Sequence, residues 1–116
     1  MNHVNVGNVT FGNDLPLAVI AGPCQLETLD HALGIAETMS RACAQAGAGF
    51  VFKASYDKAN RTSLSGRRGV GMQDGLRMLE EVRARIGCPV LTDVHDIAQA
   101  RAAGAVVDVI QIPAFL

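Results

Sequence analysis

Residues 49–61 read Gly-Phe-Val-Phe-Lys-Ala-Ser-Tyr-Asp-Lys-Ala-Asn-Arg. The first four residues form an apolar run, which predicts a buried strand. The remaining positions bring three cations together with hydroxyl and amide groups, at Lys53, Ser55, Lys58, Asn60 and Arg61. This set of donors suits an anionic, hydroxyl-rich ligand such as a sugar phosphate, although a solvated basic loop has the same composition. The rest of the chain decides between the two interpretations.

The strand at Gly49–Ala54 is one of four that the sequence predicts. Leu17–Ala21 is a continuous apolar run ended by Gly-Pro, which predicts a strand buried on both faces. Two further strands are predicted at 89–94 and 106–112. Helices are predicted between them at 28–46 and 72–86, and a third, short helix is predicted to end near residue 104. The expected capping residues are Thr28, Gly47, Gly87, and Asp96 with Gln99.

This alternation of strands and helices predicts an α/β fold with a parallel sheet and right-handed crossovers. Weakly alternating residues around Gly7-Asn8 predict an N-terminal hairpin. The chain is therefore divided into a hairpin, residues 1–14, and β/α units, residues 15–116, within one domain. Polar side chains follow the predicted strand ends at Cys24, the Lys53–Arg61 segment, Asp93 with His95, and Gln111. Ligands bind at this edge of parallel α/β sheets, so the ligand interpretation of the basic segment is favoured.

Composition excludes several classes of protein. The chain has 116 residues, 49% of them hydrophobic, and a net charge of -1, which argues against disorder and against a nucleic-acid partner. It contains no apolar stretch of membrane-spanning length, and its first residues lack the features of a signal peptide. Three cysteines without a short-range pairing pattern indicate a reducing compartment, so a cytoplasmic location without membrane association is expected.

Several segments together resemble the 3-deoxy-D-manno-octulosonate 8-phosphate synthase family, also called the 2-dehydro-3-deoxyphosphooctonate aldolases. The matching segments are 20–24 (Ile-Ala-Gly-Pro-Cys) with Glu27, 52–61, 68–71, 92–95 (Thr-Asp-Val-His) and 108–116. The string Lys-Ala-Asn-Arg at 58–61 is the most specific, because the related seven-carbon synthases typically have Lys-Pro-Arg there. The family fold is an eight-stranded β/α barrel. The resemblance therefore implies that the chain is its first four β/α units, truncated after the fourth strand.

The resemblance implies condensation of phosphoenolpyruvate with arabinose 5-phosphate, for lipopolysaccharide core biosynthesis. It implies catalytic roles for Lys53 and Asp93. The substrate-binding residues that it implies are Lys53, Ser55, Lys58, Asn60, Arg61, Gln111 and Ala114. A histidine, His95, follows Asp93, where a loop-packing role is equally expected. Tyr56 stands where the family often has phenylalanine.

The resemblance further implies a divalent metal and a homo-oligomer. Members with cysteine at the position of Cys24 use it as a metal ligand, so the metal-dependent class is implied. The remaining ligands are expected outside this chain. Asn60 and Arg61 reach a neighbouring subunit's site in the family, which implies a homo-oligomer, commonly a tetramer.

Two alternatives stay open. One is a seven-carbon sugar-acid phosphate synthase, against which Ala59-Asn60 counts. The other is a non-catalytic half-barrel that binds phosphate or pairs with another half-barrel. Because the family's second half supplies further phosphate-binding residues, the isolated chain is expected to be inactive.

Overall fold

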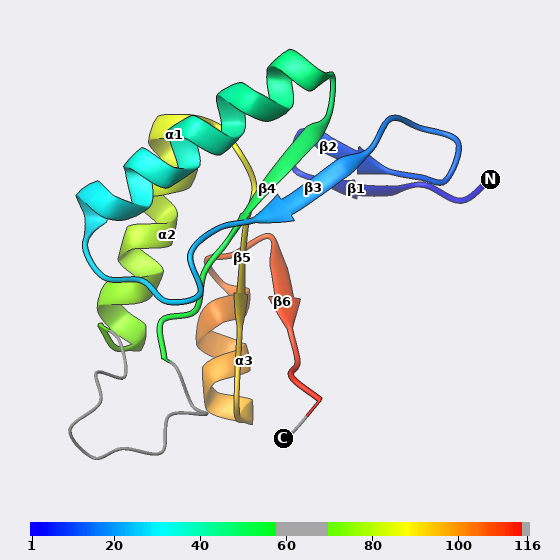
Figure 1. Ribbon diagram of the computed structural model, residues 1–116. Coiled ribbons are helices and arrows are strands. Elements are labelled where there is room, and N and C mark those ends of the chain that lie inside the picture. The colour runs from blue at the N-terminus through cyan, green and yellow to red at the C-terminus, as the bar shows by residue number, and fades with distance from the viewer. Residues whose placement is uncertain (58–69, 115–116) are drawn as a thin grey trace.

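The computed structural model describes residues 1–57 and 70–114, and it confirms an α/β fold with a parallel four-stranded sheet and three helices. The sheet has the order β3-β4-β5-β6, and every neighbouring pair is parallel (Figure 1). Its strands are β3 (Ala18–Ala21), β4 (Gly49–Lys53), β5 (Val90–Asp93) and β6 (Val109–Gln111). The helices are α1 (Leu29–Ala46), α2 (Met72–Ile86) and α3 (Ile97–Gly104).

Four of the six helix ends lie at the capping residues that the sequence predicts. The Thr28 hydroxyl accepts the His31 N–H at 3.1 Å, and Gly47 closes α1 with a φ of 72°. Gly87 closes α2 with a φ of 82°. The Asp96 carboxylate accepts the Gln99 N–H at 2.8 Å at the start of α3. These ends are set locally, by backbone donors and acceptors that the helix itself leaves unpaired.

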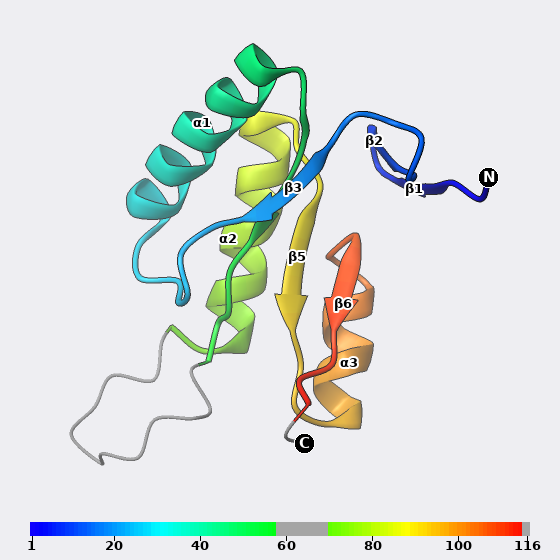
Figure 2. The same ribbon diagram turned by 45° about the vertical axis from the view of Figure 1, so that its right-hand side comes forward.

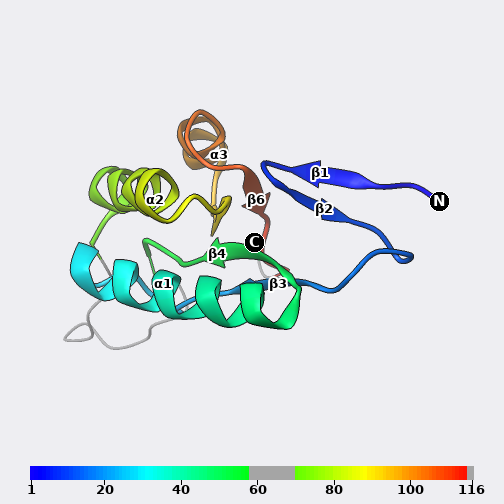
Figure 3. The same ribbon diagram turned by 90° about the horizontal axis from the view of Figure 1, so that it is seen from above.

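The three helices cover one face of the sheet, and the N-terminal strands lie on the other side (Figure 3). The main core fills the space between helices and sheet. Its largest members include Phe52, Leu79 and Val82, none of which is exposed to solvent. Burial of these aliphatic and aromatic side chains is the main favourable contribution to folding.

Strands β1 (Val4–Val6) and β2 (Val9–Phe11) pair antiparallel across a two-residue turn. Gly7 in this turn has a φ of 56°, a conformation that glycine adopts without strain. The Asn8 side chain donates to the Gly87 carbonyl at 3.1 Å, which ties the turn to the end of α2. Val9 packs with Val51 and Leu91 in a second apolar cluster. The paired strands therefore seal the end of the sheet where its strands begin; we call this end the floor.

Two strand predictions need correction. Strand β3 is not buried on both faces, because Leu17 is 74% and Ile20 44% exposed. Within the described residues β3 pairs only with β4, so its other edge lacks a neighbour. Strand β6 is shorter than the predicted 106–112, because the N–H groups of Val106 and Val107 both donate to the Ala103 carbonyl in a turn that follows α3.

The structure shows how deeply each cysteine is buried and whether any described helix could span a membrane. Cys43 and Cys88 are buried packing residues, and burial raises the pKa of the Cys88 thiol. Cys24 is exposed. No helix in residues 1–57 or 70–114 has both the length and the apolar character needed to cross a membrane.

Candidate active site

Three neighbouring strands carry the same pattern of an apolar residue followed, two positions later, by a polar one. The pairs are Val51 and Lys53, Leu91 and Asp93, and Val109 and Gln111. Residues two apart on a strand lie on the same face. Because Val51 and Leu91 pack against β2, the polar member of each pair lies on that same face, nearer the strand's C-terminal end. Strands β5 and β6 run toward this end, away from β1 and β2 (Figure 2), and β4 runs parallel to β5.

The strand register brings these polar positions together. Asp93 is the direct partner of Gln111, and Lys53 is the partner of Leu91, two residues before Asp93. Their exposure differs: Lys53 is exposed, whereas the Asp93 side chain is only 16% exposed. One cation and two hydrogen-bonding side chains thus share one edge, which we call the polar edge. Its donors and acceptors suit a small anionic ligand with hydroxyl groups.

His95 also lies at the polar edge, where its ring contacts Asp93; from the sequence a loop-packing role was equally expected. Its Nε2 lies 3.1 Å from Asp93 Oδ2, and its side chain is 17% exposed. The Val94 N–H between them donates to the Gln111 carbonyl at 3.1 Å, which continues the β5–β6 pairing. The second ring nitrogen, Nδ1, is buried and has no partner in the described residues. A carboxylate that contacts one ring nitrogen fixes the orientation of the imidazole.

The segment after β3 is held against the segment after β4. Gln25 and Ser55 form an isolated parallel bridge, and the Leu26 N–H donates to the Ser55 carbonyl at 2.8 Å. Gly22 allows this close approach, because a Cβ at that position would overlap the Lys53 carbonyl oxygen. Cys24 lies in sequence between Gly22 and Gln25, so it follows the C-terminal end of β3.

Other predicted site residues have different outcomes. The Ser55 hydroxyl donates to the Asp57 carbonyl at 2.6 Å, so it shapes a local turn. Ala114 is exposed, in the turn after β6. Lys58, Asn60 and Arg61 lie outside the described residues. The predicted substrate contacts of all five residues stay predictions.

The described residues do not form a complete metal site. No group of three or more His, Cys, Asp and Glu side chains comes together in residues 1–57 and 70–114 in a way that could hold an ion. Cys24 can offer a single thiolate, whereas a divalent metal needs several ligands. The predicted metal therefore requires ligands from beyond these residues.

Tyr56 packs in the main core on the helix side of the sheet and bonds there to Gln99, and neither residue was predicted to belong to the site. The Tyr56 hydroxyl donates to Gln99 Oε1 at 2.8 Å, and the His95 N–H donates to the same oxygen at 2.9 Å. Burial, with the nearby carboxylates of Asp93 and Asp96, raises the pKa of Tyr56 to about 12. The phenol therefore stays protonated and a donor at neutral pH. The sequence signal for Gln99 was its capping pattern, which gave no hint of a partner 43 residues away.

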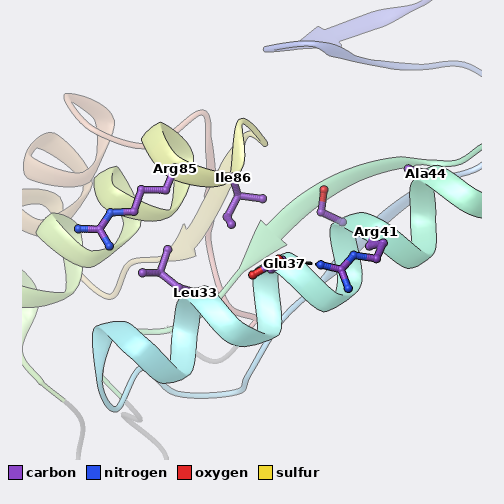
Figure 4. A pocket seen from close by; sticks show the side chains of 7 residues that line it. Leu33, Glu37, Arg41, Ala44, Arg85 and Ile86 are labelled. Atoms are coloured by element: carbon purple, nitrogen blue, oxygen red, sulfur yellow. Dashed lines mark hydrogen bonds and ion pairs between the residues drawn. The ribbon is translucent and has the colours of Figure 1, made fainter.

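A groove of about 550 Å³ between α1 and α2 is a separate feature (Figure 4). Its charged lining is paired within each helix. Arg41 lies 2.7 Å from Glu37, and Arg85 lies 2.9 Å from Glu81. The groove belongs to the helical layer, and none of the predicted site residues that the structure describes lines it. We therefore assign the candidate site to the polar edge.

Comparisons with known proteins agree with the resemblance in sequence. The chain is 58% identical over 113 residues to the 2-dehydro-3-deoxyphosphooctonate aldolase of Granulibacter bethesdensis, covering 97% of this chain and 40% of that protein. Proteins of the same name from Nitrobacter winogradskyi and Bartonella quintana are 54% and 51% identical, again over 97% of this chain and over 39% and 41% of their own lengths. The chain thus spans about two fifths of the length of these relatives. The profile of the DAHP synthetase I family matches residues 2–116, and the chain therefore belongs to the DAHP synthetase I family.

Proposed function

We propose that this chain is part of an enzyme that condenses phosphoenolpyruvate with D-arabinose 5-phosphate, giving 3-deoxy-D-manno-octulosonate 8-phosphate and inorganic phosphate. The observation that carries the proposal is the polar edge, with Lys53, Asp93, His95 and Gln111 gathered at the C-terminal ends of adjacent strands. The name of the relatives, 2-dehydro-3-deoxyphosphooctonate aldolase, supports it. The product belongs to lipopolysaccharide core biosynthesis.

The reaction needs fixed positive charge, because both substrates are anions that repel each other. The enol carbon of phosphoenolpyruvate attacks the sugar aldehyde, water adds to the adjacent carbon, and phosphate leaves with cleavage of its carbon–oxygen bond. Lys53 is proposed to hold phosphoenolpyruvate and to protonate the aldehyde oxygen as it becomes an alkoxide. Asp93 is proposed to orient a sugar hydroxyl or the attacking water, and Gln111 and Ser55 to line the site.

The remaining predicted residues complete this proposal. Lys58 is proposed to bind phosphoenolpyruvate, Asn60 and Arg61 to bind arabinose 5-phosphate, and the Ala114 N–H to bind phosphate. Cys24 is proposed as one ligand of a divalent metal whose other ligands come from outside the described residues. Such a metal, when bound, would act as a Lewis acid on a coordinated oxygen.

A partial barrel is the proposed architecture. The four parallel strands and three helices are consistent with the first four β/α units of an eight-stranded barrel, preceded by a β-hairpin at the floor. Within the described residues one edge of β3 has no neighbouring strand, and Ile20 is exposed, which supports a continuation of the sheet beyond this chain. The complete enzyme is proposed to be a cytoplasmic homo-oligomer, commonly a tetramer in this family.

Phosphate release by the full-length protein that contains this chain tests the proposal. Release is expected from phosphoenolpyruvate with arabinose 5-phosphate, and a chelator is expected to abolish it. A four-carbon aldose phosphate is the matched control, because the same chemistry would convert it to a seven-carbon acid. Faster release with the four-carbon sugar would favour the seven-carbon synthase, and no release with either sugar would refute catalysis.

A further inference from the structure

We propose that Gln99 is a positioning residue that fixes the two halves of the polar edge relative to each other. Its Oε1 accepts hydrogen bonds from Tyr56, which follows β4, and from the His95 N–H, which follows β5. The proposal rests on the proposed function for its kinetic test. The structural part of it stands on the contacts alone.

The need for such a tie follows from where the strand pairing ends. The last backbone bond between these segments in the described residues joins the Ala54 N–H to the Leu91 carbonyl at 3.3 Å. The Thr92 hydroxyl then donates to the Ala54 carbonyl at 2.8 Å. Beyond this point the β4 segment still pairs with the segment after β3, at the Gln25–Ser55 bridge. The bond from Tyr56 to Gln99 continues the connection between the β4 and β5 segments.

Both ends of the connection are firmly held. Tyr56 is 1% exposed, and its backbone carbonyl accepts the Gly71 N–H at 3.3 Å at the start of α2. Gln99 lies in the first turn of α3, where its own N–H donates to Asp96. A hydrogen bond between two anchored groups needs little further ordering, so it transmits position well.

Each of the two connected segments carries a residue with a proposed catalytic role. Tyr56 lies three residues after Lys53 on one segment. On the other segment, the residue whose N–H is held by Gln99 is His95, whose ring contacts Asp93. Loss of the Gln99 oxygen would let these segments separate, and small displacements of catalytic groups lower turnover strongly.

The chemistry of the contact makes a sharp test possible. Both partners of Oε1 are donors, so a carboxylate oxygen can replace the amide oxygen, whereas a thioether cannot do so well. In the full-length protein, Gln99→Met is expected to lower kcat by roughly tenfold to a hundredfold with little change in KM. Gln99→Glu is expected to restore kcat to within about threefold of the wild type. Gln45→Met, at an exposed site on α1, is the matched control and is expected to leave kcat unchanged.

Tyr56→Phe provides a second variant that preserves the buried ring. It is expected to lower kcat by about threefold to tenfold on its own, and to have no further effect in the Gln99→Met background, because both changes break the same bond. Additive effects of the two substitutions would overturn the proposal. So would wild-type kcat in Gln99→Met, or a Gln99→Glu variant as slow as Gln99→Met.

Hydrogen exchange separates this inference from the proposed function. The His95 amide is expected to exchange about tenfold faster in Gln99→Met than in Gln99→Glu or Gln45→Met. This difference is measurable even if the wild type releases no phosphate, which would refute the proposed function alone. Equal exchange at His95 in all the variants would refute the positioning role.

Discussion

The two ends of the sheet are built from the same strands but have opposite chemistry. At the floor, Val9 of β2 packs with Val51 and Leu91 in a buried apolar cluster. At the polar edge, two residues further along the strands, Lys53 and Asp93 occupy the same face. One strand thus contributes apolar packing at one end and polar side chains, the proposed ligand contacts, at the other. Substitutions at the two ends should therefore have separable effects.

Lys53→Met is expected to have the largest effect, and only on activity. The loss of one fixed cation should reduce phosphate release by about 10²- to 10³-fold, because charge stabilisation is the main task proposed for this residue. Unfolding by urea should change little, since Lys53 is exposed. Arg101→Met, which removes an exposed cation from α3, is the control. Equal activity in the two variants would refute the assignment of Lys53.

Gly75→Ala tests how tightly α2 packs against Tyr56, the residue that bonds to Gln99. A Cβ at Gly75 would overlap the Cβ of Tyr56, so the free energy of unfolding should fall by about 1–3 kcal/mol and kcat should fall with it. Gly34→Ala, on α1, is the matched control, because nothing lies within 4 Å of a Cβ there. It should raise the free energy of unfolding by about 0.5–1 kcal/mol through helix propensity. If Gly75→Ala stabilised the protein as much as Gly34→Ala, the close packing would be wrong.

Val9→Ala tests the contribution of the floor to stability. Val9 is 6% exposed, and loss of its two methyl groups should lower the free energy of unfolding by about 1–2 kcal/mol. The kcat of the folded protein should not change, since the polar edge is at the other end of the strands. Val4→Ala in β1, where the side chain is 59% exposed, should change neither quantity. A lowered kcat in Val9→Ala would show that the two ends are coupled.

The smallest expected effect is a pH dependence that comes from Tyr56. Its pKa is raised to about 12 in the folded protein, above the ordinary value of 10.0, so the folded state binds the phenolic proton more tightly. The resulting stability is fully present below pH 10 and is lost as the pH rises from about 10 through 12. The free energy of unfolding, measured with urea, should therefore fall more steeply with pH across this range in the wild type than in Tyr56→Phe. If the free energy of unfolding fell equally with pH in the two proteins, the pKa of Tyr56 would not be raised by folding.

Local chemistry made much of the fold predictable. Helix α1 begins after Thr28 and ends before Gly47, and α3 follows the Asp96–Gln99 pair, as the capping patterns indicated. The placement of Lys53, Asp93 and Gln111 on one face also follows from strand parity. The burial of β3 was not predictable from its sequence, because it depends on whether a second strand lies beside it.

The succession of strands and helices, most of their caps, and the polar ends of the strands could thus be read from the sequence, because each depends on residues close together in the chain. The contacts between distant residues come from the tertiary structure. Tyr56 bonds to Gln99, and Asp108 accepts hydrogen bonds from Arg83 at 3.1 Å and from the Val90 N–H at 2.9 Å. Such contacts form where strand register and helix packing bring two segments together, and no local pattern of residues shows which distant segments will meet.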